Sequence, residues 1–480
     1  MKKTHITLIV LLTALLAGCM TYGGLHLYAD RSALPQDTRI GGLQLGGMDR
    51  QQAVQLVQAK LKELEQLPLH LEDDEQAVDM KLTLGTVGVS YHADAFFTAV
   101  EKLGQGHLWE RVQARRSFGA SWDIDVHMEP ETLNTLLDQD WEERRYGHPV
   151  DAVRQITSND EVRYIPEKSV YRLDRTRLIR ELGQQLPRDF KVLDHADIKE
   201  LSLKLPLSRL EPKRTVESLK QEGIERRIVQ FSTSLGSSST GRVHNVQAAA
   251  KTVDGMILRP DEVFDYAKVI ADAESKYGFR EAPVIVSGRL EPGIGGGICQ
   301  VSSTLYHAAL QTGLNIVERR NHSLPVSYLP RGQDATFATG SINFRFKNNT
   351  GKHLLLRANV ESGQLVVKFF GTFPKEITYQ IESKTVSTIS IPDSYVQNNS
   401  LLPGQSQVLI PGKPGYVVET YRTKLVHGKT VERETISRDT YRAQKRVIAR
   451  NSHASKGTPR LEEPRTEEAP LVEDGVRSQQ

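Results

Sequence analysis

The stretch Gly293–Tyr306 reads GIGGGICQVSSTLY and is the most informative part of the chain. Its glycines predict a tight turn, because glycine adopts backbone conformations that other residues avoid. After Cys299 the apolar side chains recur with helical spacing, which predicts a helix from Gln300 to Thr312 with one face against the core. Cys299 is therefore expected where a glycine-rich turn enters a helix.

A cysteine at a helix N-terminus is a candidate nucleophile. The free backbone amides at that end favour negative charge and lower the pKa of a thiol toward neutrality. They would also hold the oxyanion that forms when a thiolate attacks a carbonyl group. The alternative is a buried packing residue, since free cysteine is among the most buried residue types. The residues expected to bind substrate or oxyanion through this turn are Gly296, Gly297, Ile298 and Gln300.

The first 28 residues predict export. Lys2 and Lys3 precede the apolar run 6–17, which is the pattern of a secretory signal. The ending Leu16–Cys19 reads LAGC and resembles a bacterial lipobox, which implies lipid on Cys19. The alternative is an uncleaved anchor helix, because residues 6–28 carry no Asp, Glu, Lys or Arg and about 20 residues cross a bilayer. Both interpretations place the chain outside the cytoplasmic membrane and attached to it.

The cysteine count supports a functional role for Cys299. The chain has 2 cysteines, and if Cys19 carries lipid then Cys299 has no disulfide partner. Exported proteins that use cysteine structurally have several in pairs. A single exported thiol therefore calls for a functional explanation.

Composition narrows the class of protein. With 480 residues, 38% of them hydrophobic and 25% charged, the chain should hold several soluble domains. A net charge of +3 gives no case for nucleic acid as a partner. The 14 histidines show no metal-ligand spacing, so neither a metal nor another cofactor is expected.

One unit is expected to recur from residue 38 to residue 212: a β-like run, an aspartate and an amphipathic helix. The aspartates Asp49, Asp94 and Asp174 are expected to cap the helices that follow them. These segments resemble the peptidoglycan-binding-like domain found in cell-wall enzymes, which implies two α+β modules at 38–125 and 126–212. Ordinary α+β packing without a repeat is the alternative. Residues 213–244, rich in serine and glycine, are expected to form a connector.

The segment 225–372 resembles the VanW family. Its motifs occur in the family's order: Arg242–Val246, Pro260–Phe264, Gly278–Ala282, Gly295–Tyr306, Glu318–Ser323, Tyr328–Gly332 and Asp334–Thr336. The sequence departs from the family at Pro260-Asp261-Glu262, where Pro-Gly-Glu is common. The resemblance implies an α+β domain in which the glycine-rich turn leads the helix that carries the cysteine.

A cysteine nucleophile needs a base and a group that orients the base. His322 follows a short apolar pair that predicts a strand, and it is the expected base; a structural or surface histidine is the alternative. His307 and His244 are weaker candidates. Asp334 would orient the imidazole as the acid of a triad does, or it would only bond the backbone of a turn.

The C-terminal part is expected to be all-β. Residues 338–372 predict strands that close the domain, and residues 375–450 resemble the small five-glycine domain attached to cell-wall enzymes and adhesins. Residues 451–480 contain few large apolar side chains, which predicts a disordered tail. The fold class is thus an α+β multidomain protein with two N-terminal modules, a VanW-type domain and a small β module.

The resemblance implies a cysteine L,D-transpeptidase that acts on peptidoglycan stem peptides and forms 3→3 cross-links through a Cys299 thioester. Arg319 and Arg320 would pair with a peptide carboxylate, or they would be solvated. Water as the acceptor would make the protein a carboxypeptidase. The remaining alternative is a non-catalytic protein that binds the cell wall.

Overall fold

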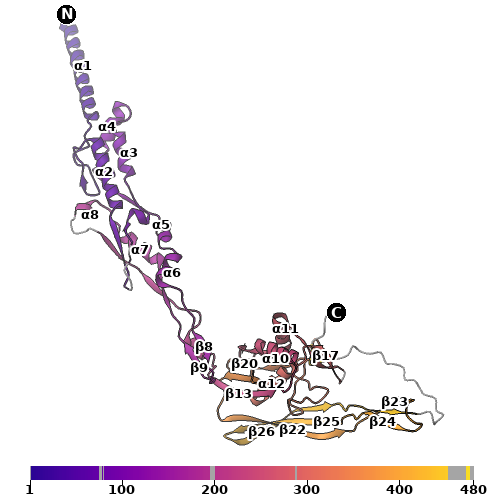
Figure 1. Cartoon of the computed structure of the whole chain (residues 1–480). Coiled ribbons are helices and arrows are strands. Elements are labelled where there is room, and N and C mark those ends of the chain that lie inside the picture. Colours follow the sequence, from indigo (N-terminus) through magenta and orange to yellow (C-terminus); the bar gives the residue numbers. More distant parts are fainter. Residues whose placement is uncertain are drawn as a thin grey trace. The chain divides into compact units, whose positions relative to one another are not determined.

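The computed structural model describes residues 2–74, 78, 80–194, 200–286, 289–451 and 472–475 of the chain. The chain divides into two compact units (Figure 1). Unit 1 comprises Met1–Val150 and Lys168–Lys213, and unit 2 comprises Asp151–Glu167 and Arg214–Gln480. Helices and several separate sheets occur in the described residues, so the expected α+β class is confirmed at this level.

The first helix, α1 (Lys2–Ala29), is the one helix in the described ranges that is long and apolar enough to cross a membrane. It runs without interruption through Cys19, whose thiol is exposed. This helix contains the segment predicted as a signal or an anchor. Lipid on Cys19 stays a prediction.

Unit 1 is built from short helices and short strands. Its further helices are α2 (Arg50–Glu65), α3 (Asp94–Lys102), α4 (Leu108–Arg116), α5 (Pro130–Leu136), α6 (Gln139–Tyr146), α7 (Arg175–Gln185) and α8 (Lys191–Asp194), with the 3-10 turn Gly85–Val87. Its strands are β1 (Arg39–Ile40), β2 (Leu43–Gln44), β3 (Pro68–Glu72), β4 (Leu82–Thr83), β5 (Val89–His92), β6 (Ser121–Trp122), β7 (Asp125–Met128), β10 (Val170–Leu173), β11 (Leu201–Lys204) and β12 (Leu207–Leu210).

Two of the three aspartates predicted to cap helices in unit 1 do so. The Asp49 and Asp174 carboxylates accept hydrogen bonds from the first-turn amides of α2 and α7, as expected. Asp94 is instead the first residue of α3, and Ala93 is the N-cap. The aspartate there faces the positive end of the helix dipole without capping it.

The described residues of unit 1 share one hydrophobic core, which runs from Leu34 to Leu205. Strand β3 pairs in parallel with β11, with Leu69 opposite Leu201, so segments far apart in the sequence lie in one sheet. The expected boundary between residues 125 and 126 falls inside β7. The division into two modules stays a prediction.

The described residues of unit 2 form four helices and most of the described strands. The helices are α9 (Val216–Gln221), α10 (Thr240–Val253), α11 (Tyr266–Tyr277) and α12 (Ile298–Gln311). The strands up to residue 371 are β8 (Val153–Ile156), β9 (Val162–Ile165), β13 (Arg226–Ser234), β14 (Ile257–Leu258), β15 (Val263–Asp265), β16 (Glu281–Val286), β17 (Arg289–Ile294), β18 (Asn315–Glu318), β19 (Arg345–Lys347), β20 (Leu354–Glu361) and β21 (Gln364–Gly371). The later strands are β22 (Ile377–Ile389), β23 (Asp393–Gln397), β24 (Ser406–Ile410), β25 (Gly415–Val426), β26 (Lys429–Tyr441), β27 (Arg446–Arg450) and β28 (Val472–Glu473).

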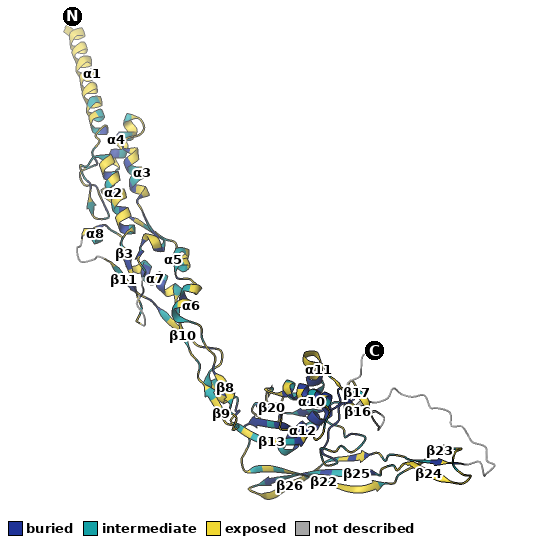
Figure 2. Ribbon diagram, viewed as in Figure 1, coloured by how far each residue is buried: buried dark blue, intermediate teal, exposed yellow. Residues whose placement is uncertain are grey.

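The core of unit 2 lies between helices and a four-stranded sheet in the order β13-β21-β20-β14. In Figure 2 the helices α10 and α12 and this sheet carry most of the dark-blue, buried positions. The run Leu365–Val367 on β21 is buried at every residue, as predicted for a strand covered on both faces. The run does not alternate between polar and apolar residues, which fits a central strand.

The expected connector 213–244 is instead part of the folded domain. It contains α9 and β13, and β13 pairs with β21 so that Phe231 lies opposite Val367. The following helix α10 starts at Thr240 and is capped by Ser239, so its first turn lies inside the expected connector. The serine- and glycine-rich run after β13 hid the strand, because it marks only the turn between β13 and α10.

From β22 to β27 the described residues are all-β, with one sheet in the order β22-β25-β26 and another in the order β23-β27-β24. The structure differs in part from the disordered tail predicted for residues 451–480. Residues 452–471 and 476–480 lie outside the described residues, but Val472–Glu473 form strand β28 against β16. The prediction missed this strand because it used only the low apolar content of the tail. Composition does not reveal that a strand edge elsewhere in the chain can pair with the tail.

Candidate functional site

The site is centred on the N-terminal end of α12, which is buried from Ile298 to Leu310. Its N-cap is Gly297, with φ at +107°, a left-handed conformation that glycine adopts without strain. A Cβ at Gly296 would lie 2.4 Å from the carbonyl oxygen of Pro283, so only glycine lets the turn pass this strand. The helix begins two residues before its predicted start, and Cys299 is its second residue.

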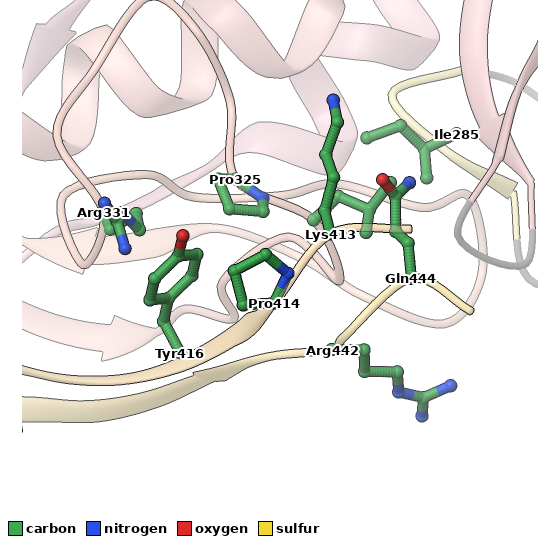
Figure 3. A pocket seen from close by; sticks show the side chains of 9 residues that line it. Ile285, Pro325, Arg331, Lys413, Pro414, Tyr416, Arg442 and Gln444 are labelled. Carbon is green, nitrogen blue, oxygen red and sulfur yellow. The ribbon is translucent and has the colours of Figure 1, made fainter. Parts of the chain in front are cut away.

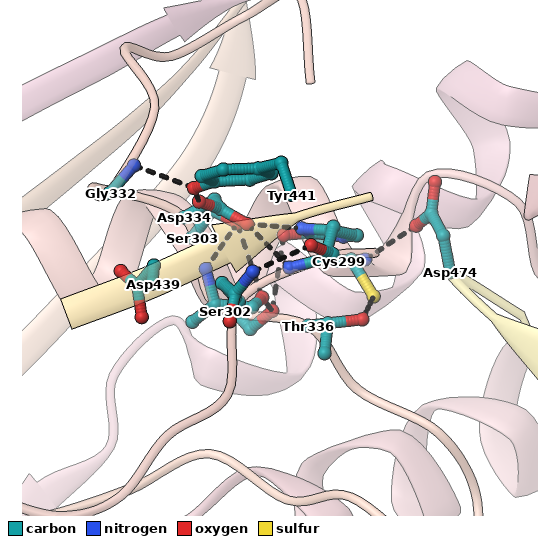
Figure 4. Close-up of polar contacts among 12 residues, drawn as sticks. Cys299, Ser302, Ser303, Gly332, Asp334, Thr336, Asp439, Tyr441 and Asp474 are labelled. Atoms are coloured by element: carbon teal, nitrogen blue, oxygen red, sulfur yellow. Dashed lines mark hydrogen bonds and ion pairs between the residues drawn. The ribbon is translucent and has the colours of Figure 1, made fainter. Parts of the chain in front are cut away.

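The Cys299 sulfur lies against the backbone of a neighbouring segment (Figure 4). Its Sγ accepts a hydrogen bond from the Phe337 amide at 3.0 Å and lies 3.7 Å from Thr336 Oγ1. Two serines of α12 hold this segment in place: Ser302 Oγ donates to the Ala335 carbonyl at 2.6 Å, and the Ala335 amide donates to Ser303 Oγ at 3.0 Å. The thiol is fully buried.

His322 and Asp334 form a buried pair next to the thiol. His322 Nδ1 lies 2.7 Å from Asp334 Oδ2, and the His322 backbone amide donates to the same oxygen at 2.7 Å. Because Nδ1 is bonded to a carboxylate, the imidazole proton is fixed on that nitrogen. Nε2 is buried and has no hydrogen-bond partner among the described residues. This nitrogen is free to act on a neighbouring group, and Cys299 and His322 are close enough for each to shift the pKa of the other.

The charges of the pair stabilise one another. Burial alone would raise the pKa of Asp334, but the hydrogen bond from His322 and the positive charges of His322 and Arg319 lower it to about 2. Burial opposes protonation of His322, yet Asp334 and Cys299 outweigh it and place the imidazole pKa well above its usual value. The arrangement therefore keeps Asp334 ionised and makes His322 a stronger base than a free imidazole.

The thiol itself differs from the expectation. Burial raises the pKa of Cys299, the negative charge of Asp474 raises it further, and His322 only partly compensates. The predicted lowering by the helix N-terminus is thus outweighed in this arrangement, first by burial of the thiol and second by an anion that occupies the amides at that end.

That anion is the Asp474 carboxylate, which in Figure 4 faces the helix end at Cys299. Its Oδ1 accepts hydrogen bonds from the Cys299 amide at 2.8 Å and from the Gly297 amide at 3.1 Å. Donors at these distances from one oxygen have the geometry of an oxyanion hole. Of the expected donors, Ile298 and Gln300 instead give their amides to carbonyls of the turn. Sequence reasoning missed Asp474 because it lies in the predicted disordered tail.

The two arginines expected to bind a carboxylate have different surroundings. The Arg319 side chain is only 6% exposed, and its Nη1 donates to both carboxylate oxygens of Asp439, at 2.6 and 2.7 Å. Its Nε donates to the Asp334 carbonyl at 2.6 Å, so this side chain is committed to an internal ion pair. Arg320 is exposed.

Tyr441 is a further residue of the site that the sequence did not reveal. Its hydroxyl donates to Asp334 Oδ1 and accepts a hydrogen bond from the Gly332 amide at 2.6 Å. Like Asp439, it lies on β26, in the region predicted as a separate β module. No local motif marks either residue, since only the fold brings β26 to Asp334.

The two weaker histidine candidates lie elsewhere. His307 stacks on Phe231 with the ring centroids 3.7 Å apart, and burial lowers its pKa to about 4. His244 Nε2 is 3.1 Å from the Gly278 carbonyl oxygen. Across the described ranges neither has a hydrogen bond to Cys299.

Two clefts adjoin the site. One, of about 580 Å³, is lined by residues that include Arg242, Gln300, Tyr328 and Asp474. The other, of about 450 Å³, lies beside β25 and is lined by basic and aromatic side chains (Figure 3): Arg331, Lys413, Tyr416 and Arg442 among them. Ile285 and Pro325 line both clefts. Within the described part of the chain no group of His, Cys, Asp and Glu is arranged to hold a metal ion.

Comparison with known proteins identifies two domains. A family model described as VanW like protein matches residues 241–370, and a G5 domain model matches residues 380–452. The chain therefore carries a VanW-like domain and a G5 domain, which confirms the resemblance predicted from the motifs. The resemblance of the N-terminal segments to peptidoglycan-binding-like domains stays a prediction.

Two curated relatives match part of the chain. The chain is 36% identical over 170 residues to the uncharacterized protein YoaR of Bacillus subtilis (strain 168), covering 35% of this chain and 56% of that protein. It is 26% identical over 153 residues to the vancomycin B-type resistance protein VanW of Enterococcus faecalis (strain ATCC 700802 / V583), covering 31% and 56%. The chain thus spans little more than half the length of these relatives.

Two solved structures are similar to the G5 region. The IgA1 protease G5 domain is 28% identical and covers 17% of this chain and 98% of its own, with a TM-score of 0.14. HP0197-G5 is 25% identical and covers 16% of this chain and 100% of its own, with a TM-score of 0.12.

Proposed function

Because this chain carries a VanW-like domain and a G5 domain, we propose that it acts on peptidoglycan in the cell envelope. Its activity is that of a cysteine L,D-transpeptidase that joins stem peptides. Cys299 is the nucleophile, His322 the base and Asp334 the residue that orients the base. The G5 domain holds the protein at the wall, and α1, as a helix or through lipid on Cys19, holds it at the membrane.

One observation carries this proposal. His322, whose Nδ1 is bonded to the Asp334 carboxylate, has a free Nε2 beside the Cys299 thiol, and the helix end at this thiol offers two converging backbone amides. A nucleophile, a base, an orienting acid and oxyanion donors are the groups that acyl transfer requires. In this chain they come from α12, from residue 322 and from residue 334, and the described residues hold each of them by hydrogen bonds.

In the first half-reaction, His322 takes the Cys299 proton and the sulfur attacks the carbonyl carbon before the terminal residue of a stem peptide. The amides of Gly297 and Cys299 stabilise the oxyanion. The peptide C–N bond then breaks, His322 returns the proton to the leaving amine, and a thioester remains on Cys299.

In the second half-reaction, a side-chain amine of a neighbouring stem attacks the thioester. His322 removes a proton from the amine, the C–S bond breaks, and the thiol is restored as a 3→3 cross-link forms. Water in place of the amine gives hydrolysis, and the protein would then be a carboxypeptidase.

The test is incubation of the full chain, in detergent, with tetrapeptide muropeptides, followed by mass spectrometry of the products. Cross-linked dimers are expected with the wild type and with Cys19→Ala, the matched cysteine control, and no dimers are expected with Cys299→Ala. Loss of a terminal residue without dimers, dependent on Cys299, would identify a carboxypeptidase. Dimers that persist with Cys299→Ala would overturn the assignment.

A second candidate, a non-catalytic protein that binds the cell wall, is favoured by the complete burial of Cys299 and the raised pKa of its thiol. It predicts a chain that binds sacculi and leaves muropeptides unchanged. Slow alkylation of Cys299 in the presence of bound muropeptide would support this candidate, whereas faster alkylation or a trapped thioester would support the enzyme.

A further inference from the structure

The segment 472–475, called the tail segment below, is laid into the candidate site as an extended peptide. Its strand β28 pairs antiparallel with β16, with Glu473 opposite Ile285. Gly475 then bridges in parallel to Ala338, and the Asp474 amide donates to the Phe337 carbonyl at 3.4 Å. Phe337 is the residue whose amide bonds the Cys299 sulfur. The backbone of the tail segment therefore runs directly past the nucleophile.

Pairing with the edge of a sheet is a common way for a protein to bind a peptide. The main-chain hydrogen bonds provide affinity for any extended backbone, and the side-chain positions provide specificity. Here the edge is β16, whose other neighbour in its sheet is β17. The groove beside the thiol is thus suited to a peptide.

The Asp474 carboxylate occupies a site built for an anion. Oδ1 takes the amides of Gly297 and Cys299, and Oδ2 lies 3.1 Å from Arg242 Nη1. Arg242 is mostly buried, and its Nη2 donates to Gln300 Oε1 at 3.1 Å, which fixes the guanidinium beside the helix end. A helix N-terminus combined with a buried arginine and a bound carboxylate is more than a general electrostatic preference.

The position after the carboxylate accepts only glycine. A Cβ at Gly475 would lie 2.7 Å from Val284 Cγ1 and 2.8 Å from the Ile294 carbonyl oxygen. The groove therefore selects for an acidic residue followed by a residue without a side chain. The sequence Asp474-Gly475 meets both requirements.

We propose that the tail segment is an intramolecular pseudosubstrate: it occupies the groove along β16 in the resting chain and is displaced by an extended substrate peptide that carries a carboxylate. This inference rests on the proposed function, since it places the substrate peptide in the same groove. Arg242 is then a positioning residue for the substrate's carboxylate, and the amides of Gly297 and Cys299 pass from Asp474 to the reacting carbonyl oxygen.

The resting state protects the thiol in two ways. Cys299 has no exposed surface while the tail segment is in place. The charge of Asp474 also raises the pKa of the thiol, and this contribution disappears when the segment leaves. Displacement would both uncover the sulfur and favour the thiolate, which is the reactive form.

The experiment compares iodoacetamide alkylation of Cys299 in three chains, read by peptide mass spectrometry, with the same three chains unfolded in guanidinium chloride as the reference. The first is the full chain, the second ends at Leu471 and lacks the tail segment, and the matched control ends at Gly475 and retains it. Removal of the segment should speed alkylation at least about tenfold, since it removes several charge-assisted hydrogen bonds. The control should react at the rate of the full chain.

A synthetic peptide with the sequence of residues 470–478, added to the chain ending at Leu471, should restore protection. The same peptide with Asp474→Asn should restore much less. Equal alkylation rates in all three chains, each shown by circular dichroism to be folded, would overturn the pseudosubstrate.

The outcomes separate this inference from the proposed function. Faster alkylation without any muropeptide turnover would support the pseudosubstrate and contradict the transpeptidase. Turnover by the full chain together with equal alkylation rates would contradict the pseudosubstrate and leave the transpeptidase supported.

Discussion

Tyr441 is far from Asp334 in the sequence, yet removal of its hydroxyl should weaken the hydrogen bonds that hold Asp334 in the site. In Tyr441→Phe, Asp334 Oδ1 loses the hydroxyl hydrogen bond, and the Gly332 amide loses its acceptor at 2.6 Å. Tyr441 and Asp334 are both fully buried, so water does not replace these bonds. Leaving the buried Gly332 amide without an acceptor costs about 1–3 kcal/mol. The cost of local opening at Gly332 should fall by that amount.

Hydrogen exchange measures this cost directly. The backbone amide of Gly332 should exchange about 5- to 150-fold faster in the variant, since about 1.4 kcal/mol corresponds to a factor of ten. The matched control is Tyr421→Phe, which removes a hydroxyl of the same domain that donates to Glu419 at 2.6 Å. Exchange at Gly332 that is the same in both variants would refute the coupling between β26 and the site.

Three further perturbations have expected outcomes. Because Asp334 has its pKa lowered to about 2 from 3.8, its charge stabilises the fold above pH 4, and about 2 kcal/mol should be lost as the pH falls toward 2; acid titrations followed by circular dichroism should show this loss in the wild type and a flatter profile in Asp334→Asn. His307 has its pKa lowered from 6.5 to about 4, so it stabilises the fold above pH 6.5, and about 3 kcal/mol should be lost on acidification to pH 4; His307→Phe, which keeps a ring against Phe231, should remove this dependence in melting curves and retain muropeptide activity. Gly475→Ala should expel the tail segment by steric clash and speed alkylation of Cys299, and an unchanged rate would show that the groove yields to the added methyl group.

The sequence predicted the centre of the site because its signals are local. A glycine run before a helix places a cysteine at the helix end, and an apolar pair before His322 marks the end of a strand. The structure brings these two residues and Asp334 together, as the interpretation required. The catalytic roles of the three residues remain predictions that the experiments above test.

What the sequence left out depends on contacts between distant segments. Asp439 and Tyr441 reach the site from another domain, and Asp474 reaches it from a tail whose composition indicates disorder. The backbone amides that serve as oxyanion donors also could not be predicted. If the glycine-rich turn were one residue longer or shorter, different amides would be free of hydrogen bonds within the turn. The raised pKa of the thiol follows from Asp474 and from burial, and neither is encoded near residue 299.

The pair between Arg319 and Asp439 has a consequence for how this protein can evolve. Domains that are shuffled between genes are usually joined by linkers, and each can be exchanged without harm to the other. Here an exchange of the C-terminal domain for another of the same family would strand a buried arginine without its carboxylate, unless the incoming domain carried an acid at the same place on its strand. The two domains are therefore expected to be inherited together, and the lineage of one should record the lineage of the other.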